Sequence, residues 1–296
     1  MRVLVIAGIL CSVLGLCHAA DLTGYHQRVG VKEAQRIKQA EDKLFSSGPH
    51  RPAISSAPIV GGAIAPINNH PYLAGLIIDL FGLPHTSACG GSILTNSRIL
   101  TAAHCWFDGN FQAWRFTVVL GSPFLYHGGV RVPTSTFAIH HQYNPNTLAN
   151  DLAILYLPSA VPFSAAIRPV VLPTGPWTTF NLHNVWAVAS GYGRYSDVSN
   201  PTINTMVRNV FLRVITNQEC RAVYGGFIQD SNVCTCGWGG VGICRGDSGG
   251  PLIVQNQGQD VLIGISSFVA EDGCKLGFPS AFARVTSYID WIRMHL

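Results

Sequence analysis

The chain has 296 residues, of which 48% are hydrophobic and 11% are charged, and its formal net charge is +4. The Lys and Arg residues form no basic cluster, so the charge pattern does not support nucleic-acid binding. No internal repeat is visible, and only the extreme N-terminus carries an apolar run of the kind found in targeting segments.

The first residues have the pattern of a secretory signal peptide. Arg2 precedes an apolar run over 3–16, and the small residues Ala19 and Ala20 follow it. That run is too short to span a bilayer comfortably. We expect cleavage after Ala19, with cleavage after Ala20 as the alternative. No other segment is long and apolar enough to cross a membrane, so we expect a secreted product without membrane association.

A helix and a linker are predicted next. Charged side chains surround Ile37, Ala40 and Leu44, which predicts an amphipathic helix over 31–45. The sequence Gly48-Pro49-His50-Arg51-Pro52 ends that helix, and the residues up to Pro58 are expected to form an extended linker.

From Ile59 onward, short apolar runs alternate with turns rich in Gly, Pro, Asn and Ser. Many short strands separated by turn signals predict an all-β sandwich or barrel. A helix is expected only at the C-terminus, over 286–295, and the remaining length is large for one core. The predicted strands cover 72–78, 98–101, 116–120, 152–156, 185–189, 210–214, 252–254, 261–266 and 281–285.

Three motifs suggest nucleophilic catalysis. Ser248 lies among glycines in Gly246-Asp247-Ser248-Gly249-Gly250-Pro251, where the backbone can direct successive N–H groups into one cavity. A serine hydroxyl needs an adjacent base, and Thr101-Ala102-Ala103-His104-Cys105 offers one. Asp151, in Asn150-Asp151-Leu152-Ala153, can orient that base. Each motif alone is weak, but the order His, Asp, Ser is that of chymotrypsin-type enzymes.

Together these motifs resemble the trypsin/chymotrypsin-like serine proteases. The resemblance covers 59–296 and includes Ile59-Val60-Gly61-Gly62, Cys89-Gly90-Gly91-Ser92, Ser190-Gly191-Tyr192-Gly193 and Tyr288-Ile289-Asp290-Trp291-Ile292. It is strongest to insect midgut chymotrypsin-like and elastase-like proteases of the lepidopteran type. It implies two six-stranded antiparallel β-barrels with the active site between them and a C-terminal helix. The expected divisions are a signal peptide (1–19), a propeptide (20–58) and a protease domain (59–296).

The resemblance also implies the roles of the site residues. His104 is the general base and then the general acid, Asp151 holds its ring, and Ser248 is the nucleophile that forms an acyl-enzyme. The backbone N–H groups of Gly246 and Ser248 form the oxyanion hole. In activation, the α-amino group of Ile59 is expected to pair with the carboxylate of Asp247, so the precursor is expected to be nearly inactive.

Specificity is expected to be non-tryptic. By resemblance, Gly242 lies at the base of the primary pocket, where trypsins carry Asp. Ser267, Val269 and Ser280 are expected to contribute to its walls, and Val269 favours small or medium apolar residues over large rings. Arg245 either overhangs the mouth of the pocket or is a solvated surface charge.

Nine cysteines are present, and two of them leave with the signal peptide. The resemblance implies the disulfides Cys89–Cys105, Cys220–Cys234 and Cys244–Cys274, with Cys236 left over. Pairing of Cys220 with Cys236 is the open alternative.

We therefore predict a secreted serine endopeptidase, made as a zymogen and used in digestion. Its expected partners are protein and peptide substrates, an activating protease and protein protease inhibitors; no cofactor or metal is expected, and we expect a monomer. Eleven Arg but only one Lys follow Ile59, which suits an alkaline medium such as a gut lumen. The alternative is a catalytically silent homologue that acts in binding or immune signalling.

Overall fold

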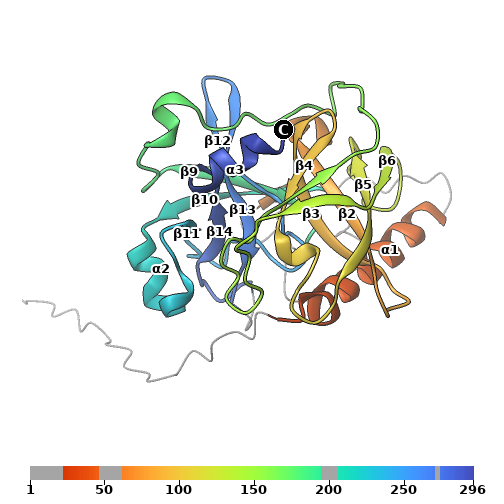
Figure 1. Ribbon diagram of the computed structural model, residues 1–296, viewed down its shortest axis with the longest axis horizontal. Coiled ribbons are helices and arrows are strands. Elements are labelled where there is room, and N and C mark those ends of the chain that lie inside the picture. The colour runs from red at the N-terminus through yellow and green to blue at the C-terminus, as the bar shows by residue number, and fades with distance from the viewer. Residues whose placement is uncertain (1–22, 47–61, 195–205, 271–273) are drawn as a thin grey trace, which may run out of the picture.

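The structure, a computed structural model, describes residues 23–46, 62–194, 206–270 and 274–296. The expected signal peptide and the bond between Pro58 and Ile59 lie outside these residues. Two antiparallel β-sheets form the body of the molecule, and a long helix near the N-terminus lies against one of them (Figure 1). The described residues contain no helix that is long and apolar enough to cross a membrane.

The first sheet has the strand order β6-β5-β2-β3-β4-β8-β7. Its strands are β2 (Leu73–Leu80), β3 (Ser87–Thr95), β4 (Arg98–Thr101), β5 (Ala113–Leu120), β6 (Val130–Thr134), β7 (Thr136–Ile139) and β8 (Ala153–Tyr156). Only Ser135 separates β6 from β7, and these two strands end the sheet on opposite sides. The strand pairings of the described residues include none between β6 and β7, so this first barrel is a half-barrel.

The second sheet closes on itself. Its order is β1-β10-β11-β14-β13-β12-β9, and an additional pairing between β9 and β10 completes a six-stranded barrel to which β1 adds an edge. The strands are β1 (Gly62–Ile64), β9 (Trp186–Gly191), β10 (Arg208–Ile215), β11 (Asn232–Thr235), β12 (Pro251–Asn256), β13 (Gln259–Phe268) and β14 (Ser280–Arg284). The expected two-barrel, mostly β architecture is confirmed.

Three α-helices accompany the sheets: α1 (Val31–Ser46), α2 (Asn217–Tyr224) and α3 (Ile289–Met294). The predictions of α1 and of a C-terminal helix are confirmed, and Trp291 and Ile292 of α3 are buried. The sequence analysis missed α2. Its N-terminal signal is a capping box, in which the Thr216 hydroxyl accepts from the Glu219 N–H and the Glu219 carboxylate accepts from the Thr216 N–H.

The two barrels meet closely where the chain is rich in glycine. A Cβ atom on Gly90 of β3 would lie 3.1 Å from the Cα of Gly250, which precedes β12. The N–H of Gly90 donates to the carbonyl of Ser248 at 2.7 Å. The glycine in β3 therefore lets one barrel hold the loop that carries Ser248 against the other.

Candidate active site

His104 and Asp151 come from neighbouring segments of the first barrel. His104 lies in a short 3-10 helix (Ala103–Cys105) that follows β4, and Asp151 directly precedes β8. Because β4 and β8 are paired, with Thr101 opposite Ala153, the two side chains emerge at the same end of the sheet. The preceding Asn150 has a φ of 56°, a left-handed conformation that Asn adopts more readily than most residues.

The carboxylate of Asp151 holds the imidazole of His104. Its Oδ2 accepts a hydrogen bond from Nδ1 of His104 at 2.8 Å, and its Oδ1 accepts from the His104 backbone N–H at 2.9 Å. Since Nδ1 carries the proton in this bond, Nε2 is the atom left to accept one. Nε2 is buried, and no residue in the described part of the chain forms a hydrogen bond with it.

Ser267 is a further partner of Asp151 that the sequence analysis did not identify. Its hydroxyl donates to Oδ2 of Asp151 at 2.6 Å. Burial alone would raise the pKa of the Asp151 carboxyl, but the charge of His104 and the hydrogen bonds from His104 and Ser267 hold it below its usual value. Ser267 therefore contacts the carboxylate and also lines the cavity at Ser248, where its place in the substrate pocket stays a prediction.

Ser248 faces the same cavity as His104. This cavity has a volume of about 300 Å³, and Ser267, Val269 and Arg245 also line it. Gly246 has a φ of 96°, the left-handed region that favours glycine, so the backbone can turn there directly before Asp247 and Ser248.

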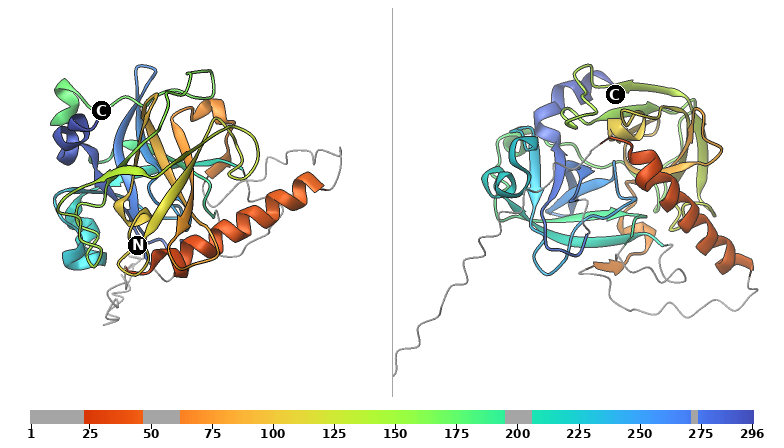
Figure 2. Two further views of the ribbon diagram at one scale, coloured as in Figure 1. Left: turned by 45° about the vertical axis from the view of Figure 1, so that its right-hand side comes forward. Right: turned by 90° about the horizontal axis from the view of Figure 1, so that it is seen from below.

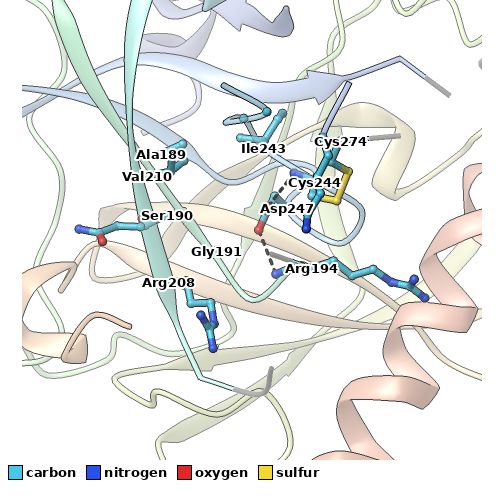
Figure 3. Close-up of a pocket in the computed structure, with 15 residues that line it drawn as sticks. Ala189, Ser190, Gly191, Arg194, Arg208, Val210, Ile243, Cys244, Asp247 and Cys274 are labelled. Atoms are coloured by element: carbon cyan, nitrogen blue, oxygen red, sulfur yellow. Dashed lines mark hydrogen bonds between the residues drawn. A yellow bond between two sulfur atoms is a disulfide. The ribbon is translucent and has the colours of Figure 1, made fainter. Parts of the chain in front are cut away.

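Asp247 lines a second and smaller cavity of about 40 Å³, and Ser248 is not among its lining residues (Figure 3). Its Oδ1 accepts from the Gly193 N–H and its Oδ2 from the Cys244 N–H, each at 2.9 Å. Burial raises the pKa of Asp247 to about 6, although these backbone hydrogen bonds lower it. Only a glycine fits at position 193 beside this carboxylate, since an added Cβ atom would lie 2.6 Å from it.

The residues expected to form the primary pocket are divided between the two cavities. Val269 lines the larger cavity with Ser248, whereas Gly242 lines the smaller one with Asp247. Ser280 is buried next to Gly242, and its hydroxyl accepts from the Ile243 N–H at 3.3 Å. The structure therefore does not bring Gly242, Val269 and Ser280 together around one described cavity.

Three disulfides are present in the described residues: Cys89–Cys105, Cys220–Cys234 and Cys244–Cys274. The first ties β3 to the segment that carries His104, and the third joins the loop before Ser248 to the loop before β14. Cys236 is a free, buried thiol. One His and Cys group in the described residues has the spacing of a metal site, namely Cys89, His104 and Cys105, but both of its sulfur atoms are used in the disulfide.

The comparisons with known proteins agree with this geometry. The family profile described as Trypsin matches residues 59–292. The chain is 38% identical over 238 residues to a collagenase of Hypoderma lineatum, with 80% of this chain and 86% of that protein covered. It is also 38% identical over 238 residues to brachyurin of Leptuca pugilator, with 79% of this chain and 97% of that protein covered.

A solved structure of HL collagenase is similar in fold. It superposes with a TM-score of 0.72 at 36% sequence identity, and the match covers 80% of this chain and 98% of that one. The described fold, the pairing of His104 with Asp151 and these matches lead to one conclusion: the chain belongs to the trypsin family of serine endopeptidases.

Proposed function

We propose that this chain is the zymogen of a secreted digestive endopeptidase in which His104, Asp151 and Ser248 form the catalytic triad. The observation that carries the proposal is the buried Asp151–His104 pair, which fixes Nε2 as the proton acceptor in the cavity that Ser248 lines. The alternative, a catalytically silent homologue, requires a missing or displaced triad residue, and all three positions are filled.

The reaction follows from the roles of these groups. Nε2 of His104 takes the proton of the Ser248 hydroxyl as its oxygen attacks the scissile carbonyl. The backbone N–H groups of Gly246 and Ser248 stabilise the oxyanion, where the loss of one such donor typically costs about 3 kcal/mol. The imidazolium then gives its proton to the leaving amine, which leaves an acyl-enzyme on Ser248 that water hydrolyses by the same steps.

Specificity in this proposal is non-tryptic. No carboxylate is among the described residues that line the cavity at Ser248, and Gly242, the expected base of the primary pocket, carries no charge to pair with a Lys or Arg side chain of the substrate. Val269 narrows that cavity, which favours small or medium apolar residues. Because one relative carries the name collagenase, native collagen belongs in the substrate panel beside casein and short peptides.

Activation is proposed to occur by cleavage between Pro58 and Ile59, after which the new α-amino group pairs with Asp247. The support is the partly buried carboxylate of Asp247, which faces a small cavity and carries a raised pKa. A buried acid in this state gains stability from a nearby ammonium group. Residues 1–19 serve as the signal peptide and 20–58 as the propeptide in this proposal, and the product acts as a monomer in an alkaline gut lumen.

The test uses the full proenzyme with residues 54–58 replaced by Asp-Asp-Asp-Asp-Lys, so that enteropeptidase cuts directly before Ile59. The cut protein, once separated from its N-terminal fragment, is treated with a fluorophosphonate probe, and the labelled peptide is identified by mass spectrometry. We expect one probe on Ser248. A cut, folded protein that takes no label supports the silent homologue instead.

A further inference from the structure

The helix α1 docks on the first barrel through an apolar stripe. Ala34, Ile37 and Ala40 are buried, and Ile37 has no exposed surface. The helix runs along the outside of the barrel (Figure 2), and Ala34 and Ile37 belong to one buried cluster. The other members of that cluster are Ala65, Leu73, Ile77, Ala88, Val119, Leu125, Tyr192 and Val207. A helix in such an arrangement is part of the hydrophobic core and not a surface appendage.

Polar groups fix the position of α1 along the barrel. Both oxygens of the buried Glu41 carboxylate accept backbone hydrogen bonds, from the N–H of Leu125 and the N–H of Tyr126, each at 2.8 Å. Gly30, which directly precedes α1, lies so close to β3 that an added Cβ atom would be 1.9 Å from the hydroxyl of Ser87. These contacts fix α1 in one position along the barrel.

The residues before the helix are held just as closely. The Gly24 N–H donates to the Asp108 carbonyl at 3.0 Å, and the His26 N–H donates to the Asp108 carboxylate at 2.7 Å. Nδ1 of the buried His26 is hydrogen-bonded to the hydroxyl of Ser87 at 2.9 Å. Gly24 has a φ of 74°, which lets the chain turn toward the active site at this point.

Tyr25, between these two anchors, occupies the catalytic centre. Its ring lies edge-on to the ring of His104, with centroids 4.8 Å apart and an interplanar angle of 65°. Its hydroxyl donates to the Ala88 carbonyl at 2.8 Å. Burial raises the pKa of Tyr25, and a hydrogen bond with the Ser248 side chain offsets part of that rise. Thr23, Arg28, Val29 and Lys32 line the cavity at Ser248 together with Tyr25.

Glu33 of α1 lies near Asp247, the residue expected to pair with the new N-terminus. Its buried carboxylate pairs with Arg194 and, at 2.7 Å, with Arg36. Arg194 extends toward this helix from the cavity of Asp247 (Figure 3). A Cβ atom on Gly246 would lie 3.7 Å from the Glu33 side chain. The docked helix therefore places a carboxylate close to both Gly246 and Asp247.

We propose that residues 23–46 are a tethered peptide inhibitor. Tyr25 of this segment covers Ser248 and His104, and the segment stays bound at the same position on the first barrel after the chain is cut before Ile59. The proposal rests on the protease function proposed above and adds a second condition for activity, the release of this segment. Residues 20–58 contain no cysteine, so after the cut only noncovalent contacts hold the segment in place. Dilution or digestion of the released segment then completes activation.

The test measures inhibition by a synthetic peptide of residues 21–46 added to the enzyme cut before Ile59 and freed of its N-terminal fragment. The readouts are hydrolysis of casein and the rate of fluorophosphonate labelling at Ser248, which does not depend on substrate specificity. We expect competitive inhibition of hydrolysis and slower labelling. The freshly cut complex is expected to gain specific activity on dilution.

Three peptide variants distinguish the docking of α1 on the first barrel from the obstruction of the catalytic centre by Tyr25. Ile37→Ala removes the buried side chain but favours the helix, and we expect it to raise Ki by about 30-fold or more. Tyr25→Ala opens the catalytic centre, so we expect a similar or greater rise in Ki. Gln39→Ala, on the exposed side of α1, is the matched control and is expected to leave Ki within about 2-fold of the unaltered peptide.

The outcomes keep the two proposals apart. If the cut enzyme neither hydrolyses casein nor takes the probe, the proposed protease function is wrong. If it does both, and the unaltered peptide fails to slow labelling up to its limit of solubility, the inhibitor proposal is wrong. Equal Ki values for the Tyr25→Ala and Gln39→Ala peptides would also contradict it, because Tyr25 would then not block the site.

Discussion

The ring of Tyr25 lies against the ring of His104, with 4.8 Å between their centroids, although 79 positions separate the two residues in the chain. A scissile carbonyl attacked by Ser248 must lie within reach of the His104 imidazole. Tyr25 therefore occupies space that the reaction needs. This contact connects the N-terminal segment to catalysis without involving the bond before Ile59.

We predict that Val269→Gly shifts specificity toward large rings. Removing the valine side chain widens the cavity at Ser248, and a change of this size in an apolar pocket is worth roughly 1–3 kcal/mol. The ratio of kcat/KM for Phe or Tyr substrates to that for Ala substrates is expected to rise at least about 10-fold. Val130→Gly, at an exposed valine, is the control. A wild-type enzyme that already prefers Phe would show that Val269 does not restrict the pocket.

We predict that Asp247 makes the uncut proenzyme less stable as the pH rises. The folded-state pKa of Asp247 is raised to about 6, with burial as the main cause; Glu33 raises it and Arg36 lowers it. Because the folded state binds this proton more tightly than the unfolded state, the contribution of Asp247 to the free energy of unfolding falls as the pH rises from about 4 to about 6. The contribution is at most about 3 kcal/mol.

Urea unfolding of the proenzyme across this pH range tests that prediction. Asp247→Asn has no proton to lose, so its stability is expected to fall less than that of the wild type over the same interval. Asp290→Asn, which alters an exposed carboxylate near Arg293, is expected to follow the wild type. Parallel curves for wild type and Asp247→Asn would show that the carboxyl titrates normally.

Cys236 is predicted to be the one thiol of the mature, unreduced protein. It is only 9% exposed, and its sulfur accepts from the Trp238 N–H at 3.4 Å. We therefore expect slow alkylation of the folded protein and one alkylated cysteine after unfolding without reductant. A Cys236→Ser variant is expected to fold and to retain activity. Recovery of a disulfide-linked peptide that contains Cys236 would contradict this assignment.

Activation by trypsin is predicted to fail for the natural sequence and to succeed for Pro58→Arg. Trypsin cuts after Lys or Arg, and Pro58 provides neither before Ile59. Arg51 is followed by Pro52, and a cut there would leave seven residues before Ile59. N-terminal sequencing and an activity assay after trypsin treatment distinguish the two proteins. The prediction would be wrong if trypsin treatment of the natural proenzyme gave a new N-terminus at Ile59 and full activity.

Sequence patterns were sufficient for much of the fold. Each of the nine predicted strands corresponds to a strand of the structure. Short apolar runs bounded by turn residues indicate buried strands without any knowledge of distant contacts. The strand β3 was missed because Gly90 and Gly91 weaken its pattern, and these glycines are required by close packing rather than by strand propensity. The helix α2 is short, and its main signal is a capping box.

Contacts between distant segments could not be read from the sequence. The amphipathic pattern predicted α1, but nothing in it identifies which surface the apolar stripe covers. The hydrogen bond from Ser267 to Asp151 joins residues 116 positions apart and depends on how the two barrels meet. Likewise, the pairing of Cys220 with Cys234 rather than Cys236 depends on the three-dimensional path of β11 and the residues after it.

The most direct test of the account is the turnover of Ser248→Ala, His104→Ala and the double variant, each cut before Ile59 and freed of its N-terminal fragment. Because the nucleophile and its base act as one unit, each single variant is expected to lower kcat by about 10⁶, and the double variant to lower it little further. Near wild-type turnover in a purified, correctly folded Ser248→Ala enzyme would contradict the mechanism.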